Sequence, residues 1–262
     1  YDDITTLGRG GSDTTAVALA AELHADVCEI YTDVDGVYTA DPRIVPNARK
    51  MDEVTYDEML EMASLGAKVL HSRCVEIAKK YGVELLVCSS LNRNSGTMVR
   101  EKTKMEKMLI SGVAADKNVA KIRVAGLGND PESTFRLLNL LDRINLNIDV
   151  MIQALGKVGS KFVSFTVAKP DMLRTIDVLN DNKDLLGIKK LDYDENVAKI
   201  SVIGAGVRSH SGVAAKMFGA LANAGINTEM ITTSEIRITA LIDEAYADQA
   251  MRAIHETFLE RV

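Results

Sequence analysis

Residues 5–16 read Thr5-Thr6-Leu7-Gly8-Arg9-Gly10-Gly11-Ser12-Asp13-Thr14-Thr15-Ala16, and this stretch decides the fold that we predict. Residues 4–7 are typical of the end of a strand, and the alanine- and leucine-rich residues 16–23 predict a helix. A loop without side-chain bulk that leads into a helix N-terminus forms an anion site. Arg9 adds a guanidinium suited to a carboxylate or phosphate, whereas Asp13 suits a cation or a lysine.

Two common phosphate-binding motifs are excluded by the spacing of these glycines. The loop matches neither the P-loop nor the dinucleotide fingerprint. A bare Gly-Arg-Gly-Gly is equally compatible with a tight turn onto a packing helix, so the loop alone leaves an anion site and a structural turn open.

The wider run resembles a known family. GRGGSDTTA resembles the amino-acid kinase family, and TTLGRGGSDTTAVALA is similar to aspartokinases in particular. The resemblance implies that Arg9 and Ser12 hold L-aspartate and that Asp13 orients catalytic lysines. It also implies an ATP-dependent phosphorylation of the aspartate β-carboxylate to 4-phospho-L-aspartate.

The composition is that of an ordinary soluble globular protein. The 262 residues are 47% hydrophobic and 26% charged, a length that suggests about two domains. A net charge of -6 argues against nucleic acid as a partner, and no apolar run approaches the roughly 18 residues of a membrane span. Three scattered cysteines without a CxxC pair predict neither a disulfide framework nor a metal site, and favour a cytoplasmic location.

A second candidate segment follows the predicted strand 27–32. An acidic turn is one interpretation of residues 33–43, and a calcium loop is excluded because its first position is Tyr31 and its twelfth is Pro42. TDVDGVYTADPR resembles the nucleotide-binding segment of aspartokinases. The resemblance implies ATP, bound together with Mg²⁺, and ATP contacts from Thr32, Asp33, Tyr38 and Arg43.

Two helices are predicted next. Thr55 and Glu58 have the spacing of a capping box, and residues 67–81 predict a helix with Lys68 in its first turn. A lysine there opposes the helix dipole, which favours an anion partner over a solvated side chain. SLGAKVLHSR again resembles aspartokinases, which implies that Lys68 and Val69 flank the nucleotide. We interpret His71 as structural; Ser72 stands where the family has proline.

The second half of the chain contains an internal repeat. Residues 116–122 (DKNVAKI) recur as residues 194–200 (DENVAKI), and each copy continues with the same predicted elements. The order β-α-β-β-α-β predicts two ferredoxin-like modules. We therefore predict a kinase part over 1–107 and modules over 108–192 and 193–262. The pattern does not decide which module contains the predicted strands 109–115 and 188–193. The two modules can therefore be either serial or interleaved.

The two copies resemble the tandem ACT domains of aspartokinases. The fold class is therefore α/β: the C-terminal part of an amino-acid kinase three-layer sandwich followed by two ACT domains. The resemblance implies feedback by lysine, threonine or both, and a homo-oligomer formed through the ACT domains. Ser211 stands where the family has proline. The implied effector positions are Asn129, Thr134, Asn147, Asp149 and Gln153 in the first copy, and Val213, Ala214, Asn227, Thr228, Ser234 and Glu235 in the second.

The start of the chain bears on the expected activity. Tyr1 begins the sequence, and the Lys-Phe-Gly-Gly segment of aspartokinases does not occur in it, so we expect the later part of a longer protein. The chain alone is then expected to be inactive. The competing hypothesis is a regulatory, effector-binding chain without activity of its own. A glutamate or carbamate kinase is a third option, against which the paired modules argue.

Overall fold

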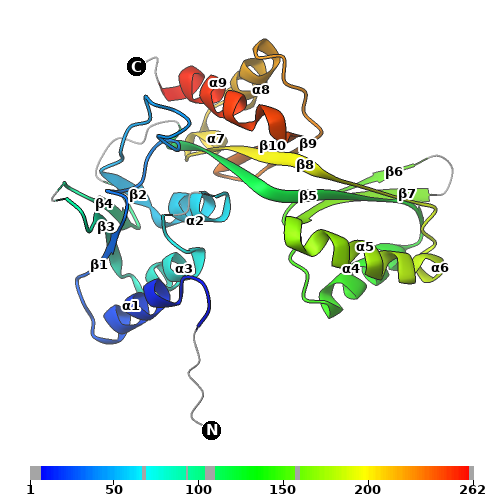
Figure 1. The fold of residues 1–262 in the computed structure, drawn as a ribbon, viewed down its shortest axis with the longest axis horizontal. Coiled ribbons are helices and arrows are strands. Elements are labelled where there is room, and N and C mark those ends of the chain that lie inside the picture. The colour runs from blue at the N-terminus through cyan, green and yellow to red at the C-terminus, as the bar shows by residue number, and fades with distance from the viewer. Residues whose placement is uncertain (1–6, 67–68, 93, 104–109, 157–159, 260–262) are drawn as a thin grey trace, which may run out of the picture.

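The computed structural model describes residues 7–66, 69–92, 94–103, 110–156 and 160–259. An amino-terminal part is built on a four-stranded sheet, and a carboxyl-terminal part is built on a six-stranded sheet. Figure 1 shows the two parts side by side, with α2 facing β5 and β8. No helix in the described ranges is long and apolar enough to cross a membrane.

The amino-terminal sheet has the strand order β1-β3-β4-β2. β1 pairs with β3 in parallel, so residues that follow these two strands leave the sheet at the same edge. β4 runs antiparallel to β3 and parallel to β2. The elements of this part are α1 (Gly11–Glu22), β1 (Val27–Thr32), β2 (Glu53–Thr55), α2 (Tyr56–Ser64), α3 (Ser72–Tyr81), β3 (Glu84–Ser89) and β4 (Thr97–Arg100).

Local signals set the ends of these helices. The predicted capping box is confirmed: Thr55 accepts from the Glu58 amide, and the Glu58 side chain accepts from the Thr55 amide. Gly82 ends α3 in the left-handed conformation at φ 70°. The predicted start of α3 at residue 67 was wrong, because the helix begins at Ser72. His71 is its N-cap, and its Nδ1 accepts from the Arg73 amide at 3.2 Å.

The carboxyl-terminal sheet has the order β6-β7-β5-β8-β10-β9, with every neighbouring pair antiparallel. Its helices lie over it in two groups, one beside β7 and one beside β10 (Figure 1). The elements are β5 (Gly112–Gly128), α4 (Pro131–Arg143), β6 (Met151–Leu155), β7 (Ser160–Ala168), η1 (Lys169–Asp171), α5 (Met172–Asp181), α6 (Lys183–Leu186), β8 (Lys190–Ile203), α7 (Gly206–Ser209), α8 (Val213–Asn223), β9 (Met230–Thr233), β10 (Arg237–Asp243), η2 (Glu244–Tyr246) and α9 (Ala247–Leu259).

The strands β5 and β8 run through both halves of this sheet. Residues 112–116 of β5 pair with residues 199–203 of β8, beside β10, and residues 121–125 pair with residues 190–194, beside β7. β8 continues without interruption across the predicted boundary between residues 192 and 193. The two central strands therefore contribute to both repeats, the arrangement that the sequence left open as interleaving.

The described structure contains three large buried clusters. One lies between the four-stranded sheet and its helices, one under α4 and α5, and one under α8 and α9. The cluster under α8 and α9 also takes in Ala40 and Val45, which come from the segment after β1. This packing joins the amino-terminal part to the last helix of the chain. The architecture confirms the predicted α/β class.

Candidate functional site

The glycine loop and α1 form the first part of the candidate site. Gly10 is the N-cap of α1 at φ 71°, and its carbonyl accepts from both the amide and the hydroxyl of Thr14. In the described structure no side chain caps this helix start; the Gly11 amide donates to the Gly8 carbonyl at 3.1 Å, and the next N–H groups of the first turn remain available to an anion. A shallow, open depression lies beside it, lined by Leu7, Gly8, Gly11, Ser12, Thr15, Ala16 and Leu19.

The loop packs directly against the beginning of α3. A Cβ added at Gly10 would come within 2.4 Å of the His71 ring, so only glycine fits here. His71 thus caps α3 and supports the loop, which agrees with its interpretation as a structural residue. Val69, two residues earlier, is half-buried and packs on the amino-terminal cluster. The structure brings the segments around Gly10 and Val69 together, although they are about sixty residues apart in sequence.

The three polar residues predicted in the loop differ in exposure. Arg9 and Ser12 are exposed, and Asp13 is half-buried, accepting from the Ser12 hydroxyl at 3.4 Å. Burial and, to a smaller extent, the charge of Asp13 together raise the pKa of the Cys74 thiol to about 12. The same two causes raise the pKa of Cys28. Asp13 therefore lies near Cys28 of β1 and Cys74 of α3, whereas Arg9 and Ser12 are exposed to solvent.

Lys68 lies outside the described residues. The sequence argument that placed it in the first turn of α3 does not hold, because α3 begins at Ser72. Its role as a phosphate-facing lysine therefore rests on the resemblance alone and stays a prediction.

The predicted nucleotide segment leaves the carboxyl end of β1. The Thr32 carbonyl accepts from the amide and hydroxyl of Ser90, which ties this end to the residue after β3. The Thr32 hydroxyl donates to the exposed Asp33 at 3.1 Å. The Tyr38 hydroxyl donates to Asp35 at 2.9 Å; this bond lowers the pKa of Asp35, while burial and then the same bond raise the pKa of Tyr38.

Arg43 already has an anion partner. Its guanidinium donates to both carboxylate oxygens of Asp41, with Nη2–Oδ2 at 2.7 Å, and this contact lowers the pKa of Asp41 and raises that of Arg43. The Arg43 side chain is 86% exposed. An exposed pair of this kind contributes little to stability, so exchange of Asp41 for a phosphate costs little.

The first set of predicted effector residues lies around α4 and β6. The Thr134 hydroxyl donates to the Gln153 side chain at 2.7 Å, which joins the start of α4 to β6. Asn129 and Asn147 are exposed on the adjoining loops. Asp149 precedes β6, and Lys199 of β8 contacts its carboxylate at 2.5 Å. Thr134 and Gln153 are thus brought together, while Asp149 faces another partner.

The effector residues predicted in the second copy are more dispersed. Val213 is 2% exposed, so its side chain belongs to the core rather than to a ligand site. Ala214, Asn227 and the partly exposed Thr228 lie near the surface. Ser234 and Glu235 form the turn after β9, where Glu235 pairs with Arg208 at 3.0 Å. Val150, which follows Asp149, and Met230, the first residue of β9, share one small buried cluster, so the segments before β6 and β9 lie near each other.

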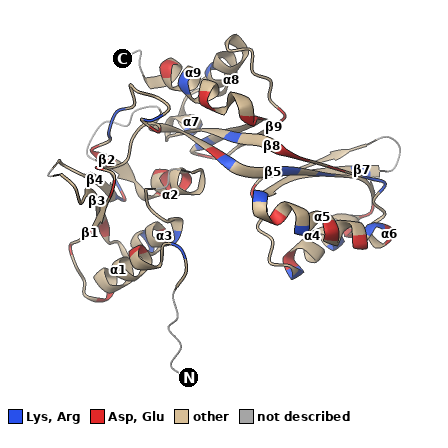
Figure 2. Ribbon diagram, viewed as in Figure 1, with Lys and Arg blue, Asp and Glu red and all other residues tan. Residues whose placement is uncertain are grey.

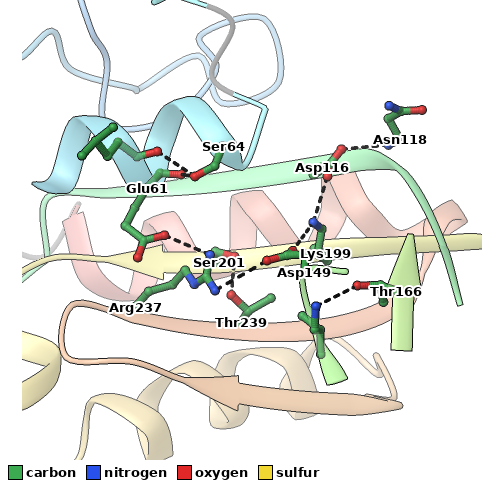
Figure 3. A network of polar contacts seen from close by, with 12 residues as sticks. Glu61, Ser64, Asp116, Asn118, Asp149, Thr166, Lys199, Ser201, Arg237 and Thr239 are labelled. Atoms are coloured by element: carbon green, nitrogen blue, oxygen red, sulfur yellow. Dashed lines mark hydrogen bonds and ion pairs between the residues drawn. The ribbon is translucent and has the colours of Figure 1, made fainter. Parts of the chain in front are cut away.

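A charged network at the centre of the sheet was missed by the sequence analysis. Lys199 is 5% exposed and contacts Asp116 at 3.1 Å in addition to Asp149. Arg237 of β10 lies 4.0 Å from Asp149 and donates to Glu61 of α2 at 2.9 Å (Figure 3). Figure 2 likewise places acidic and basic residues along the middle of β5 and β8. The repeated Asp-x-Asn-Val-Ala-Lys-Ile was the signal that could have revealed it.

Comparisons with known proteins agree with this geometry. Residues 1–89 match the amino acid kinase family, and residues 200–258 match an ACT domain. An aspartokinase of Mycolicibacterium smegmatis is 49% identical over 98% of this chain, which spans 62% of that relative. The chain thus spans less than two thirds of the length of this relative.

Solved structures show the same likeness. E. coli aspartokinase III with aspartate and ADP has a TM-score of 0.83 at 31% identity, over 97% of this chain and 57% of that chain. The same enzyme with lysine and aspartate has a TM-score of 0.77 at 30% identity, over 97% and 57%. A chain of the aspartokinase alpha and beta subunits has a TM-score of 0.54 at 41% identity, over 57% of this chain and 98% of that chain.

Fold and site together define a class, in which part of an amino-acid kinase domain precedes a pair of ACT modules. Its two central strands are shared between the modules. Within that class, the chain belongs to the aspartokinase family.

Proposed function

We propose that the protein phosphorylates the β-carboxylate of L-aspartate with ATP, giving 4-phospho-L-aspartate. The packing of Gly10 against His71 carries this proposal, because it sets the GRGGSD loop on the segment that contains Val69. The likeness to E. coli aspartokinase III in complex with aspartate and ADP supports the choice of both substrates.

Different residues bind the aspartate and the nucleotide in this proposal. Arg9 and Ser12 face solvent beside an uncapped helix start, where they hold the substrate carboxylates. Asp13 orients cationic side chains, Lys68 neutralises phosphate charge, and Tyr38 and Arg43 hold the nucleotide. Such a division suits phosphoryl transfer, in which positioning and charge stabilisation supply most of the catalysis.

Mg²⁺ enters with ATP in this proposal. The described residues contain no group of three His, Cys, Asp or Glu side chains that forms a metal cage. Mg²⁺ in phosphotransferases is commonly held by substrate phosphates and one or two carboxylates, and Asp33, exposed at the end of β1, fits that modest requirement. The bound ion neutralises phosphate charge.

Regulation by an amino acid is the second half of the proposal. The ACT modules bind lysine, threonine or both, and the protein forms a homo-oligomer through these modules in a cytoplasmic setting. Support comes from the uncapped start of α4, which presents N–H groups next to the Thr134–Gln153 pair. The lysine complex of E. coli aspartokinase III favours lysine.

A regulatory chain without activity is the alternative function. It is favoured by one observation. The structural match to a chain of the aspartokinase alpha and beta subunits covers 57% of this chain and 98% of that chain. The two proposals differ in what residues 1–107 do, because a purely regulatory chain has no use for an aspartate loop.

Hydroxamate formation from aspartate, ATP and hydroxylamine tests the proposal. The full-length protein is expected to turn over, and Arg9→Gln is expected to raise the aspartate KM at least about tenfold, since a charge-assisted pair is lost. Arg143→Gln, in the last turn of α4, is the control and should leave that KM unchanged. A full-length protein that binds lysine but forms no hydroxamate supports the regulatory alternative. The 262-residue chain alone is expected to be inactive.

A further inference from the structure

Thr39 lies in the predicted nucleotide segment and is only 2% exposed. Its amide donates to the Arg49 carbonyl at 2.9 Å, and its carbonyl accepts from the Val113 amide of β5 at 2.8 Å. Its hydroxyl oxygen accepts from the Arg49 amide at 2.9 Å. These bonds close the loop between residues 39 and 49 and fasten it to the first residues of the six-stranded sheet.

The fourth contact of Thr39 comes from the other end of the chain. His255 of α9 is fully buried, and its Nε2 lies 2.9 Å from the Thr39 hydroxyl oxygen, across 216 residues of sequence. Because both groups are buried, loss of either partner leaves a polar atom in the core without this bond, which is costly. The bond therefore fixes the segment relative to α9.

Further contacts spread along the same helix. Ala40 and Val45 share a buried cluster with Met251 and Ile254, which precede His255 in α9 by four residues and by one residue. The Arg49 guanidinium donates to the carbonyl of Leu259, the last residue of α9. The segment is thus packed on α9 along much of the helix, so α9 is part of its scaffold.

The proposed ATP contacts stand next to this anchor. Tyr38 immediately precedes Thr39, and Arg43 follows it by four residues. Tyr38 is half-buried and Arg43 is exposed, so neither side chain is fixed by core packing of its own. Thr39 lies between them and holds their backbone from the α9 side, while a bridge between Tyr38 and Lys50 holds it from the other.

We infer that His255 is a positioning residue for nucleotide binding: through Thr39 it holds the segment that carries Tyr38 and Arg43. This inference rests on the proposed function and adds that a residue of the second ACT module sets the affinity for ATP. Thermodynamic linkage then requires that ATP binding also stabilises the packing of α9.

Nucleotide binding by the full-length protein tests the inference, with mant-ATP fluorescence as the readout. His255→Met fills the site without the hydrogen bond and is expected to raise the mant-ATP Kd roughly three- to tenfold, the loss typical of one hydrogen bond. The aspartate KM should change less than about twofold. His255→Gln retains a polar atom near the Nε2 position and should restore most of the affinity.

Thr39→Val tests the other partner and has a matched control. Thr175 is also buried, and its hydroxyl donates to the Asp171 carbonyl at 2.7 Å in the other module. Thr39→Val removes the hydroxyl contacts with Arg49 and His255, and Thr175→Val removes the one with Asp171, but only Thr39→Val should raise the mant-ATP Kd. Folding of every variant is checked by circular dichroism melting.

The outcomes are distinguishable. Unchanged mant-ATP affinity in folded His255→Met overturns the positioning role and leaves the proposed function intact. A parallel rise of the Kd in Thr175→Val and Thr39→Val also overturns it, since a general loss of stability then explains both. A wild-type protein that binds no nucleotide overturns the proposed function and this inference together.

Discussion

The Lys199 ammonium lies 2.5 Å from the Asp149 carboxylate, although the two residues come from different copies of the repeat. Lys121, which occupies the equivalent place in the first copy, pairs with Glu229 of the second. The two contacts are therefore crossed, and each repeat neutralises an acid of the other. Both acids come just before an edge strand and reach the centre of the sheet.

Removal of the Lys199 ammonium is expected to destabilise the protein more than removal of its counterpart. Lys199 is 5% exposed between two carboxylates, so Lys199→Met removes the cation from Asp116 and leaves Asp149 with the more distant Arg237 at 4.0 Å. We expect a loss of about 2–3 kcal/mol, below the ~3–5 kcal/mol of a fully buried pair because Asp149 is 41% exposed. Lys121→Met, whose side chain is 23% exposed, should lose about 1 kcal/mol. Urea unfolding measures both, and equal losses would contradict the difference in burial.

Asp149 and Glu229 are expected to differ in effector binding. The start of α4 carries the Thr134–Gln153 pair, whereas α8 begins with Val213-Ala214-Ala215 and offers no such polar side chains. Asp149→Asn should weaken lysine binding to the full-length protein at least about tenfold, and Glu229→Gln should change it less than about twofold, as measured by calorimetry. Because Lys199 competes for Asp149, the effector ammonium has to share this carboxylate. The reverse ranking of the two variants would assign the effector to the second module.

Gly10 and Gly8 provide a matched pair for the loop. Both have positive φ, 71° and 79°, so an added Cβ strains the backbone at either position by about 1 kcal/mol. At Gly10 the Cβ also meets the His71 ring at 2.4 Å, whereas at Gly8 it meets nothing within 4 Å. Gly10→Ala should therefore destabilise the protein by ~1–3 kcal/mol more than Gly8→Ala and displace the loop from α3. Thermal melting separates the two variants, and similar melting temperatures would show that the loop yields freely.

Alkaline pH should destabilise the protein in part through Cys74. Burial raises the pKa of this thiol from 9.0 to about 12, so the folded state retains the proton longer than the unfolded state. The stabilising contribution is present below pH 9 and is lost as pH rises from 9 to 12, by up to about 1.4 kcal/mol per pH unit. Cys74→Ala lowers stability near neutral pH, where it leaves a cavity, but should show a shallower decline between pH 8.5 and about 10. Parallel declines in urea midpoints would exclude this contribution.

The sequence by itself determined the elements that local chemistry controls. Thr55 and Glu58 satisfy each other's amides within one turn, and Gly82 adopts a left-handed conformation at low cost, so both helix ends could be predicted. β1 was predicted with its observed limits, 27–32, because strand-forming residues are bounded there by polar turns. The repeat of DKNVAKI as DENVAKI predicted two modules, since similar sequences favour similar local structures.

Only the tertiary structure decided which residues far apart in sequence meet. The sequence pattern of a strand indicates which face of β5 or β8 is buried, but it does not indicate which strand lies beside it. The pairing of β5 with β8 through both halves of the sheet could therefore not be predicted. Lys199 looks like a surface lysine in sequence, and it is buried because Asp116 is its partner in the register. His255 contacts Thr39 because α9 packs on the segment after β1, and this packing is stabilised by the burial of apolar side chains from both elements. Local helix or strand propensities do not predict such a contact.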